Sequence, residues 1–135
     1  MAELKFRAWD KHYKEMDYIH DLYWFEEQGV RDYKGNGHCT SYVIMQYANL
    51  HDMTGKELYD GDISVDKRNR KWITWLDKGG FRICTVKEYV STGGNPLFIE
   101  ELSHMKNVRW FESTHKIIGN IYENPDIFEK TYEVI

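Results

Sequence analysis

The sequence predicts a mainly β protein with a minor α-helical part, and three observations predict this class. Short runs rich in β-branched and aromatic residues recur along the chain, most clearly at Ser41–Tyr47, Lys71–Leu76 and Ile117–Tyr122. Gly, Asp and Asn separate these runs at short intervals, as in proteins built from hairpins. Aromatic residues make up 16% of the 135 residues, which suffices for a small aromatic-rich core. We therefore expect a small antiparallel barrel from about Val43 onward.

Residues 1–42 are expected to form an N-terminal strand followed by a variable segment. Lys5–Trp9 alternates polar and apolar side chains, which is typical of a short strand, and Asp10–Lys11 predicts the turn that ends it. Met16–Tyr23 is ambiguous, because its apolar residues fit both a helical turn and one face of a strand. Gln28–His38 carries three glycines and predicts a loop.

Residues 43–135 are expected to form the barrel, with an inserted short helix and a C-terminal tail. The sequence predicts three strands in this first part, over Ser41–Tyr47, Glu57–Tyr59 and Ile63–Val65. A turn over Asp52–Gly55 and a tight corner over Asp60–Asp62 are predicted to connect them. A charged turn over Asp66–Arg70 is predicted to follow. A hairpin then joins Lys71–Leu76 to Gly80–Val86, and Gly79 suits a positive φ in its turn.

A helix is predicted to start at Asn95 and Pro96, since Asn caps free N–H groups and Pro fits the first helical position. Phe98, Leu102 and Met105 follow at i, i+4 and i+7 and are expected to form one apolar stripe. The later segments are predicted as a strand over Val108–Phe111, a strand over Ile117–Tyr122 and a helical turn over Ile127–Tyr132.

Bulk properties limit the classes of partner and the compartment. The net charge is −4, so general attraction to nucleic acid is not expected. No apolar run approaches the roughly 20 residues that span a bilayer, and Met1–Asp10 does not read as a signal peptide. We therefore expect a cytoplasmic protein without membrane contacts, in which Cys39 and Cys84 stay reduced.

Four short phrases occur in the same order as in a known family. They are Lys5–Asp10, Met45–Tyr47, Thr54–Ile63 and Ile118–Pro125. With these phrases the chain resembles the YopX-like proteins of phages and prophages over most of its length. Asp17–Thr40 is the segment least alike.

The resemblance implies an SH3-like small barrel preceded by an N-terminal portion, a tendency to self-associate, and no established activity. Small barrels bind proteins, nucleic acids and ligands alike, so the fold supplies no activity either. Two residues depart from the family pattern. Asn49 stands where a small residue such as Gly is common, and Ser64 replaces an aliphatic residue. The serine suggests that its strand is more exposed here.

Four carboxylates, Asp52, Glu57, Asp60 and Asp62, lie close together in the sequence and raise the question of a Mg²⁺ or Ca²⁺ site. Ca²⁺ takes roughly six to eight oxygen ligands, and the EF-hand spacing is absent. Asp also suits turns, because its carboxylate accepts hydrogen bonds from nearby backbone N–H groups. We therefore interpret the cluster as turn chemistry and expect no metal.

No cofactor and no catalytic residue is expected. The six His and two Cys residues form no Cys-x₂-Cys or His-x₃-His pair of the kind that binds zinc. Gly-x-Ser-x-Gly, P-loop and Rossmann patterns are also absent from the sequence. An enzyme is the least supported class.

One basic run lies beside aromatic residues, within stretch 67–75. Its candidate nucleic-acid-binding residues are Lys67, Arg68, Arg70, Lys71 and Trp72. Arg and Lys can hold phosphates while a Trp stacks on a base. The interpretation we favour is a solvated hairpin edge, where Lys discourages association between sheets. Alternation also places Trp72 opposite the face shared by Ile73 and Trp75, so one of the two Trp residues is expected in the core.

These observations favour a non-enzymatic phage or prophage accessory protein in the bacterial cytoplasm. We expect it to act through protein–protein contacts, with copies of itself as a homo-oligomer and with an unknown host or phage protein. The alternative is a nucleic-acid-binding module that uses stretch 67–75.

Overall fold

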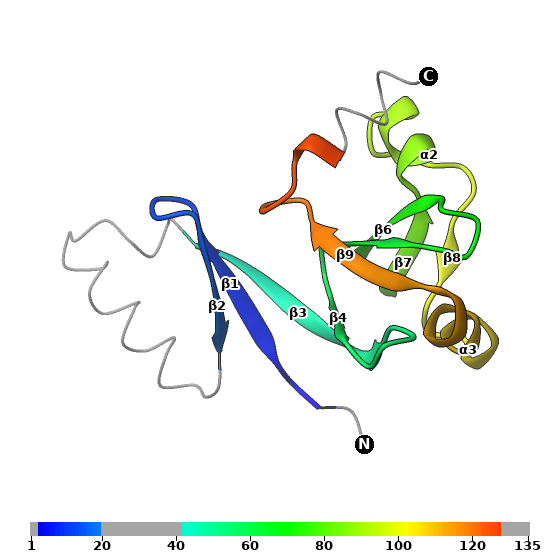
Figure 1. The fold of residues 1–135 in the computed structure, drawn as a ribbon, viewed down its shortest axis with the longest axis horizontal. Helices are drawn as coiled ribbons and strands as arrows, with labels where there is room; N and C mark the ends of the chain where they lie inside the picture. The colour runs from blue at the N-terminus through cyan, green and yellow to red at the C-terminus, as the bar shows by residue number, and fades with distance from the viewer. Residues whose placement is uncertain (1–2, 20–41, 128–135) are drawn as a thin grey trace. The chain divides into compact units, whose positions relative to one another are not determined.

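The computed structural model describes residues 3–19 and 42–127 (Figure 1). The chain divides into two compact units, Met1–Tyr47 (unit 1) and Ala48–Ile135 (unit 2). Strands dominate both units and helices are few in the described part. The predicted mainly β class with a minor α-helical part is confirmed.

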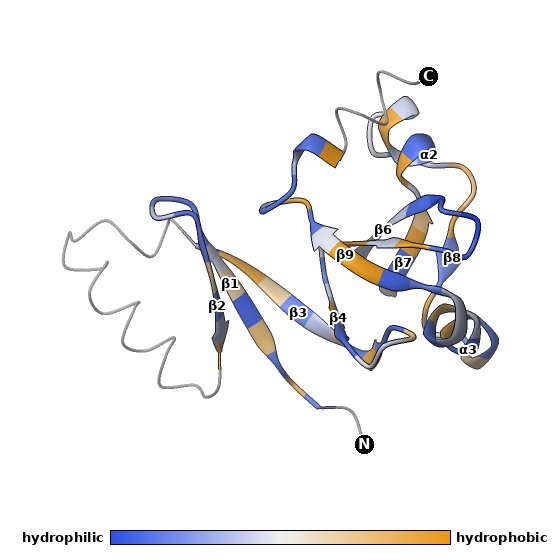
Figure 2. Ribbon diagram, viewed as in Figure 1, coloured by the Kyte–Doolittle hydropathy of each residue, from blue (hydrophilic) through white to orange (hydrophobic). Residues whose placement is uncertain are grey.

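Unit 1 is organised around β1 (Phe6–Asp10). β2 (Glu15–Ile19) pairs antiparallel along one side of β1, and β3 (Tyr42–His51) pairs along the other side through its first five residues, Tyr42–Gln46. Figure 2 shows apolar and polar residues alternating along β1. The predicted first strand is confirmed.

Asp10 shapes the turn after β1, as the sequence predicts. Its carboxylate accepts hydrogen bonds from the N–H groups of His12, at 2.9 Å, and Tyr13, at 3.0 Å. The ambiguous segment Met16–Tyr23 is a strand up to Ile19. Its remaining residues, and the loop predicted over Gln28–His38, lie outside the described residues.

Unit 2 is built around a five-stranded antiparallel sheet. Its strands, in spatial order, are β8 (Glu100–Glu101), β7 (Gly80–Thr85), β6 (Lys71–Asp77), β5 (Asp62–Val65) and β9 (Lys116–Asn120). β4 (Glu57–Tyr59) lies next to β3. Helix α2 (Val86–Ser91) follows β7 directly, and α3 (Met105–Thr114) leads into β9. The curled sheet of short strands agrees with the predicted small SH3-like barrel (Figure 1).

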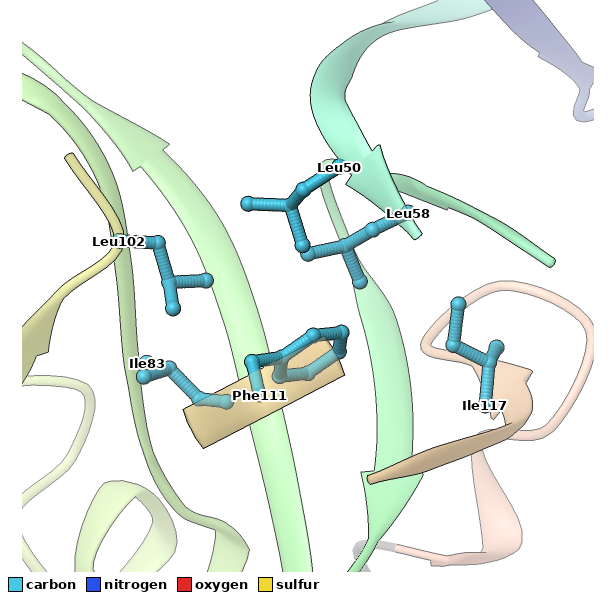
Figure 3. Packing of buried hydrophobic residues seen from close by; sticks show 6 residues of the cluster. All are labelled: Leu50, Leu58, Ile83, Leu102, Phe111 and Ile117. Carbon is cyan, nitrogen blue, oxygen red and sulfur yellow. The ribbon is translucent and has the colours of Figure 1, made fainter. Parts of the chain in front are cut away.

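The sheet of unit 2 buries apolar side chains on both faces. On one face Phe111, from α3, lies in the midst of a cluster of aliphatic residues (Figure 3). Those residues are Leu50, Leu58, Ile83, Leu102 and Ile117. On the other face Ile63, Ile73, Cys84 and Val86 form a second cluster. Burying both faces allows a small unit to remove much apolar area from water.

The predicted alternation along β6 is confirmed. Trp72 packs against the Phe111 cluster, whereas Ile73 belongs to the second cluster and Trp75 packs against it. Both Trp residues are half-buried, and each covers one face of the sheet. The prediction that only one of them lies in the core is therefore wrong. The period of two side chains in a strand accounts for this division.

The predicted turns and hairpins of unit 2 are confirmed, with one difference in the β6–β7 hairpin. Gly80, with a φ of 135°, takes the left-handed conformation, and Gly79 does not. Asp77 pairs with Gly80 at the end of the ladder. The residue that needs a positive φ is therefore Gly80, the first residue of β7, and glycine adopts such a φ readily.

The helix predicted from Asn95 is wrong. Segment 95–99 is irregular, Glu100–Glu101 is strand β8, and the helix begins only at Met105. Within the predicted stripe Leu102 is buried, but Phe98 is 80% exposed and Met105 63% exposed. The segment Val108–Phe111, predicted as a strand, is part of α3. Pairing of β8 with β7 overrides the helical spacing, because it places Leu102 in the Phe111 cluster.

The two departures from the family pattern have physical explanations. Asn49 has a φ of 62°, a left-handed conformation that Gly and Asn adopt more readily than other residues. The expectation that Ser64 marks an exposed strand is wrong, because Ser64 is 1% exposed. Its hydroxyl forms a hydrogen bond with Nδ1 of His115, at 2.9 Å, so a buried polar partner replaces the apolar environment of an aliphatic residue.

Gly119 in β9 has no room for a side chain, and we expect Gly119→Ala to lower the free energy of unfolding by about 1–3 kcal/mol. An added Cβ would overlap the side chain of Asn124, whose carbonyl oxygen accepts from the N–H of Asn120. Urea denaturation followed by Trp fluorescence measures the change. Gly79→Ala is the matched control, since an added Cβ there meets only open space. Equal stability of the two variants would contradict the prediction.

Candidate functional site

Asp66 organises the charged turn between β5 and β6. Its Oδ1 accepts hydrogen bonds from the N–H groups of Arg68 and Arg70, both at 2.9 Å. Its Oδ2 accepts from Nε of Arg70, at 2.8 Å, and from the indole N–H of Trp72, at 3.0 Å. Burial raises the pKa of Asp66, but the bonds from Trp72, Arg70 and Arg68 outweigh it and lower the pKa to about 2. The carboxylate is therefore ionised and fixes both neighbouring side chains.

The five residues of the predicted nucleic-acid site fall into two groups. Arg70 and Trp72 are held by Asp66, and the Arg70 guanidinium lies 5.6 Å from the centroid of a Trp72 ring. Lys67, Arg68 and Lys71 are exposed, and their side chains form no ion pair within residues 3–19 and 42–127. Asp66 therefore holds the side chains of Arg70 and Trp72 in the turn, whereas the three other cationic side chains are exposed to solvent.

His115 joins Trp72 to helix α3. The Trp72 and Trp110 rings meet edge-on, at 5.2 Å between centroids, and the His115 ring contacts both at 5.4 and 4.6 Å. Phe111 stacks on the imidazole, at 4.7 Å between ring centroids. Edge-on and stacked contacts of this kind stabilise beyond the area they bury. The contacts of Trp72 with the rings of Trp110 and His115 hold its side chain in position.

The imidazole of His115 is neutral at pH 7. Burial lowers its pKa, the negative charge of Asp66 opposes this, and Arg70 lowers it further, to about 4. Ser64 and His115 resemble a nucleophile and its base, but both side chains are buried. A substrate cannot reach a serine hydroxyl that is closed off from solvent, so the pair acts as a polar link within the core.

Two adjoining cavities open over the exposed part of Trp72, and we call them together the Trp72 groove. Both are lined by Trp72 and Glu100. One has a volume of about 350 Å³ and extends to Thr85, Glu88 and the segment 97–99. The other has a volume of about 340 Å³ and extends along α3 to Lys106, Asn107 and Trp110. Volumes of this size lie at the lower end of the range for ligand pockets.

The lip of the Trp72 groove carries large apolar side chains in solvent. Leu97 is 81% exposed and Phe98 is 80% exposed. Figure 2 shows that the segment leading into β8 is strongly hydrophobic. Neither residue was predicted to be exposed, because the spacing of Phe98 indicated an apolar helical stripe. The contiguous apolar run of Leu97–Ile99 after Pro96 lacks helical periodicity, and it is the signal that could have identified them.

Three of the four acidic residues of the cluster, Asp52, Asp60 and Asp62, accept hydrogen bonds from backbone N–H groups. Asp52 accepts from the N–H groups of Thr54 and Lys56, and Asp62 accepts from the N–H of Tyr59 at 2.8 Å. Asp60 accepts from the N–H of Leu76 at 3.0 Å. Among the described residues, no three His, Cys, Asp or Glu side chains are grouped so that they could hold a metal ion.

Cys84 is a free, fully buried thiol. Burial raises its pKa, as does the negative charge of Glu88, to about 12. A thiol with so high a pKa is a poor nucleophile at neutral pH. Cys39 lies outside the described residues.

No described helix combines the length and the hydropathy that a membrane-spanning helix requires.

Comparison with known proteins gives one family and one fold. A family model described as YopX protein matches residues 5–129. The fold is similar to the crystal structure of protein EF1440 from Enterococcus faecalis, with a TM-score of 0.63, 23% sequence identity, and coverage of 95% of this chain and 99% of that chain. No curated protein matches the sequence significantly. At this identity the structural similarity establishes the fold alone.

Proposed function

Since the chain belongs to the YopX family, we propose that it is a phage or prophage accessory protein that acts without catalysis, by binding other proteins in the bacterial cytoplasm. The observation that carries this proposal is the Trp72 groove with Leu97 and Phe98 on its lip. Exposed large apolar side chains beside a concave, partly aromatic surface are typical of protein-binding sites.

The environment of the reactive side chains supports a binding role. Cys84 is buried with a raised pKa, and the Ser64–His115 pair is closed off from solvent. The carboxylates of Asp52 and Asp62 accept hydrogen bonds from backbone N–H groups. The groove itself offers Glu88, Glu100 and Lys106 as its ionisable groups, and the thiol near Glu88 is the buried Cys84, whose pKa that carboxylate raises.

Self-association is part of the proposal. Unit 1 exposes Tyr13 in the β1–β2 turn, Tyr18 on β2 and Ile44 on β3, and exposed side chains of this size favour contacts between copies. The family resemblance points the same way.

Nucleic-acid binding through stretch 67–75 is the second candidate. The exposed side chains of Lys67, Arg68 and Lys71 favour it, because three cations on one turn can contact neighbouring phosphates. The engagement of Trp72 with Asp66 and the net charge of −4 make it the weaker of the two.

The proposal is tested with the tagged full chain in an extract of the bacterial host, with and without nuclease. We expect proteins to be retained after nuclease treatment, and the variant Leu97→Ser/Phe98→Ser to retain at least tenfold less of them. Leu4→Ser is the matched control, because Leu4 is 77% exposed but lies outside the groove. Sedimentation of the purified chain is expected to give a mass above 16.2 kDa.

Three outcomes would contradict parts of this proposal. Equal retention by the wild type and the Leu97/Phe98 variant would remove the Trp72 groove as the binding surface. Loss of all partners with nuclease would favour the second candidate, which then requires Lys67→Ala/Arg68→Ala to abolish capture. A monomer at all concentrations would remove self-association.

A further inference from the structure

Glu100 places a carboxylate in both cavities of the Trp72 groove. This carboxylate forms no hydrogen bond or ion pair in the described part of the chain. Its neighbour Glu101 differs, since it lies 3.9 Å from Arg82 and 3.4 Å from His104. A carboxylate at a cavity wall without a partner of its own can pair with a cation supplied by a ligand.

A second carboxylate reinforces this charge on one side of the groove. Glu88 lines the same cavity as Leu97 and Phe98, and its Oε1 accepts from the N–H of Leu97 at 3.1 Å. Lys106, in contrast, lines only the other cavity. The cavity beside the apolar lip is therefore the acidic end of the groove.

The aromatic wall also favours a cation. The negative face of an indole ring attracts ammonium and guanidinium groups, and Trp attracts them best among the aromatic residues. The guanidinium of Arg70 already lies over a Trp72 ring, 5.6 Å from its centroid, so that position is not open to a ligand cation. Trp110 meets Trp72 edge-on at 5.2 Å and extends the aromatic surface into the neighbouring cavity.

We propose that the Trp72 groove binds a partner segment in which a lysine or arginine stands next to a large apolar residue. The cation pairs with Glu100 beside Trp72 and Trp110, and the apolar neighbour packs on Leu97 and Phe98. This inference rests on the proposed protein-binding function and adds the chemistry of the partner. The net charge of −4 acts in the same direction, because it favours the approach of a basic segment over an acidic one.

The test is an NMR titration of the ¹⁵N-labelled full chain with two capped dipeptides. Acetyl-Arg-Phe-amide carries the cation, and acetyl-citrulline-Phe-amide has nearly the same shape without the charge. We expect the arginine dipeptide to shift the indole N–H signals of Trp72 and Trp110 and the amide signal of Glu100. The citrulline dipeptide is expected to bind at least fivefold more weakly, and added salt to weaken only the arginine dipeptide.

Two variants locate the charge. Glu100→Gln should weaken binding of the arginine dipeptide at least threefold, because it removes the carboxylate and keeps the shape. Glu101→Gln makes the same change one residue away, outside the groove, and should leave binding within a factor of two.

The outcomes separate this inference from the function on which it rests. Equal binding of both dipeptides, or an unchanged affinity of Glu100→Gln, would overturn the cationic partner while an apolar protein-binding groove stands. Signal shifts that depend on protein concentration alone would assign the groove to a second copy and also overturn it. If neither dipeptide binds and Leu97→Ser/Phe98→Ser still captures partners, both the inference and the binding surface are wrong.

Discussion

Replacing Asp52 with alanine is expected to lower the free energy of unfolding by about 3–5 kcal/mol. The Asp52 carboxylate is buried and joins two distant parts of unit 2. Oδ1 accepts from the N–H of Thr54 at 2.8 Å, from its hydroxyl at 2.7 Å, and from the N–H of Lys56 at 2.9 Å. Oδ2 accepts from the N–H of Ile117, in β9, at 2.7 Å. Alanine would leave these donors without their acceptor, and Ile117 N–H is the one in a buried setting.

The charge of Asp52 is part of this effect. Burial raises the pKa of the carboxyl, but the hydrogen bonds from Ile117, Thr54 and Lys56 outweigh burial and lower it below 3.8. Asp52→Asn keeps the shape and loses the charge and one acceptor, so its cost should be about half that of alanine. Urea denaturation at pH 7, followed by Trp fluorescence, gives both values. Asp17→Ala is the control, since Asp17 is exposed on β2. A loss below about 1 kcal/mol for Asp52→Ala would refute this role, because such a loss is ordinary for a surface position.

The strands and turns of this fold could be predicted because their signals are local. The Lys71–Leu76 and Gly80–Val86 hairpin, for example, combines alternating side chains with a Gly-containing turn, and the observed ladder extends from Trp72 to Asp77 on β6. The turn at Asp52 likewise follows from the hydrogen-bonding capacity of its own side chain.

The helices could not be predicted because their sequences resemble strands. Val86–Ser91 continues the apolar run of β7, and only the cap formed by the Thr85 hydroxyl and the N–H of Glu88, at 3.2 Å, turns the chain into a helix. α3 buries only Phe111 fully, while Val108 and Trp110 are half-buried against the same cluster, and this short apolar run was predicted as a strand over Val108–Phe111. The spacing of Phe98, Leu102 and Met105 fits a helix only by coincidence.

Of the residues that line the Trp72 groove, only Trp72 belongs to the nucleic-acid site predicted from the sequence, and binding at that site stays a prediction. The basic run and Trp72 were identified from the sequence, and the Asp66 bonds that hold Arg70 and Trp72 depend on the conformation of the turn. In the Trp72 groove, residue 72 lies close to residues of segment 97–110. The residue pattern within a single segment does not predict such a contact between distant parts of the chain. The contact of Trp72 on β6 with Trp110 on α3, together with the pairing of β8 with β7, creates the groove.

Acid is expected to destabilise unit 2 through His115, with a loss of about 3 kcal/mol as the pH falls from 6.5 to 4. In the unfolded chain the imidazole binds a proton below pH 6.5, but in the folded protein its pKa is lowered to about 4. Between these values the unfolded state holds more protons, so stability rises with pH. The contribution is fully present above pH 6.5 and is lost as the pH falls through 4. Asp52 and Asp66 titrate lower, since both pKa values are lowered from 3.8.

His115→Phe should remove this pH dependence while keeping a ring in the aromatic cluster. Protonated His115 would carry a charge among Trp72, Trp110 and Phe111, and its Nε2 is buried with no hydrogen-bond partner in the described part of the chain. Phenylalanine leaves Ser64 without its partner, so the variant is expected to be less stable at pH 7. As the pH falls to 4 it should gain about 3 kcal/mol relative to the wild type. Urea denaturation at pH 7, 5.5 and 4 measures this, with His12→Phe at an exposed position as the control. A stability difference between His115→Phe and the wild type that is the same at all three pH values would mean that the imidazole reaches solvent in the folded protein, and that the core around Trp72 opens.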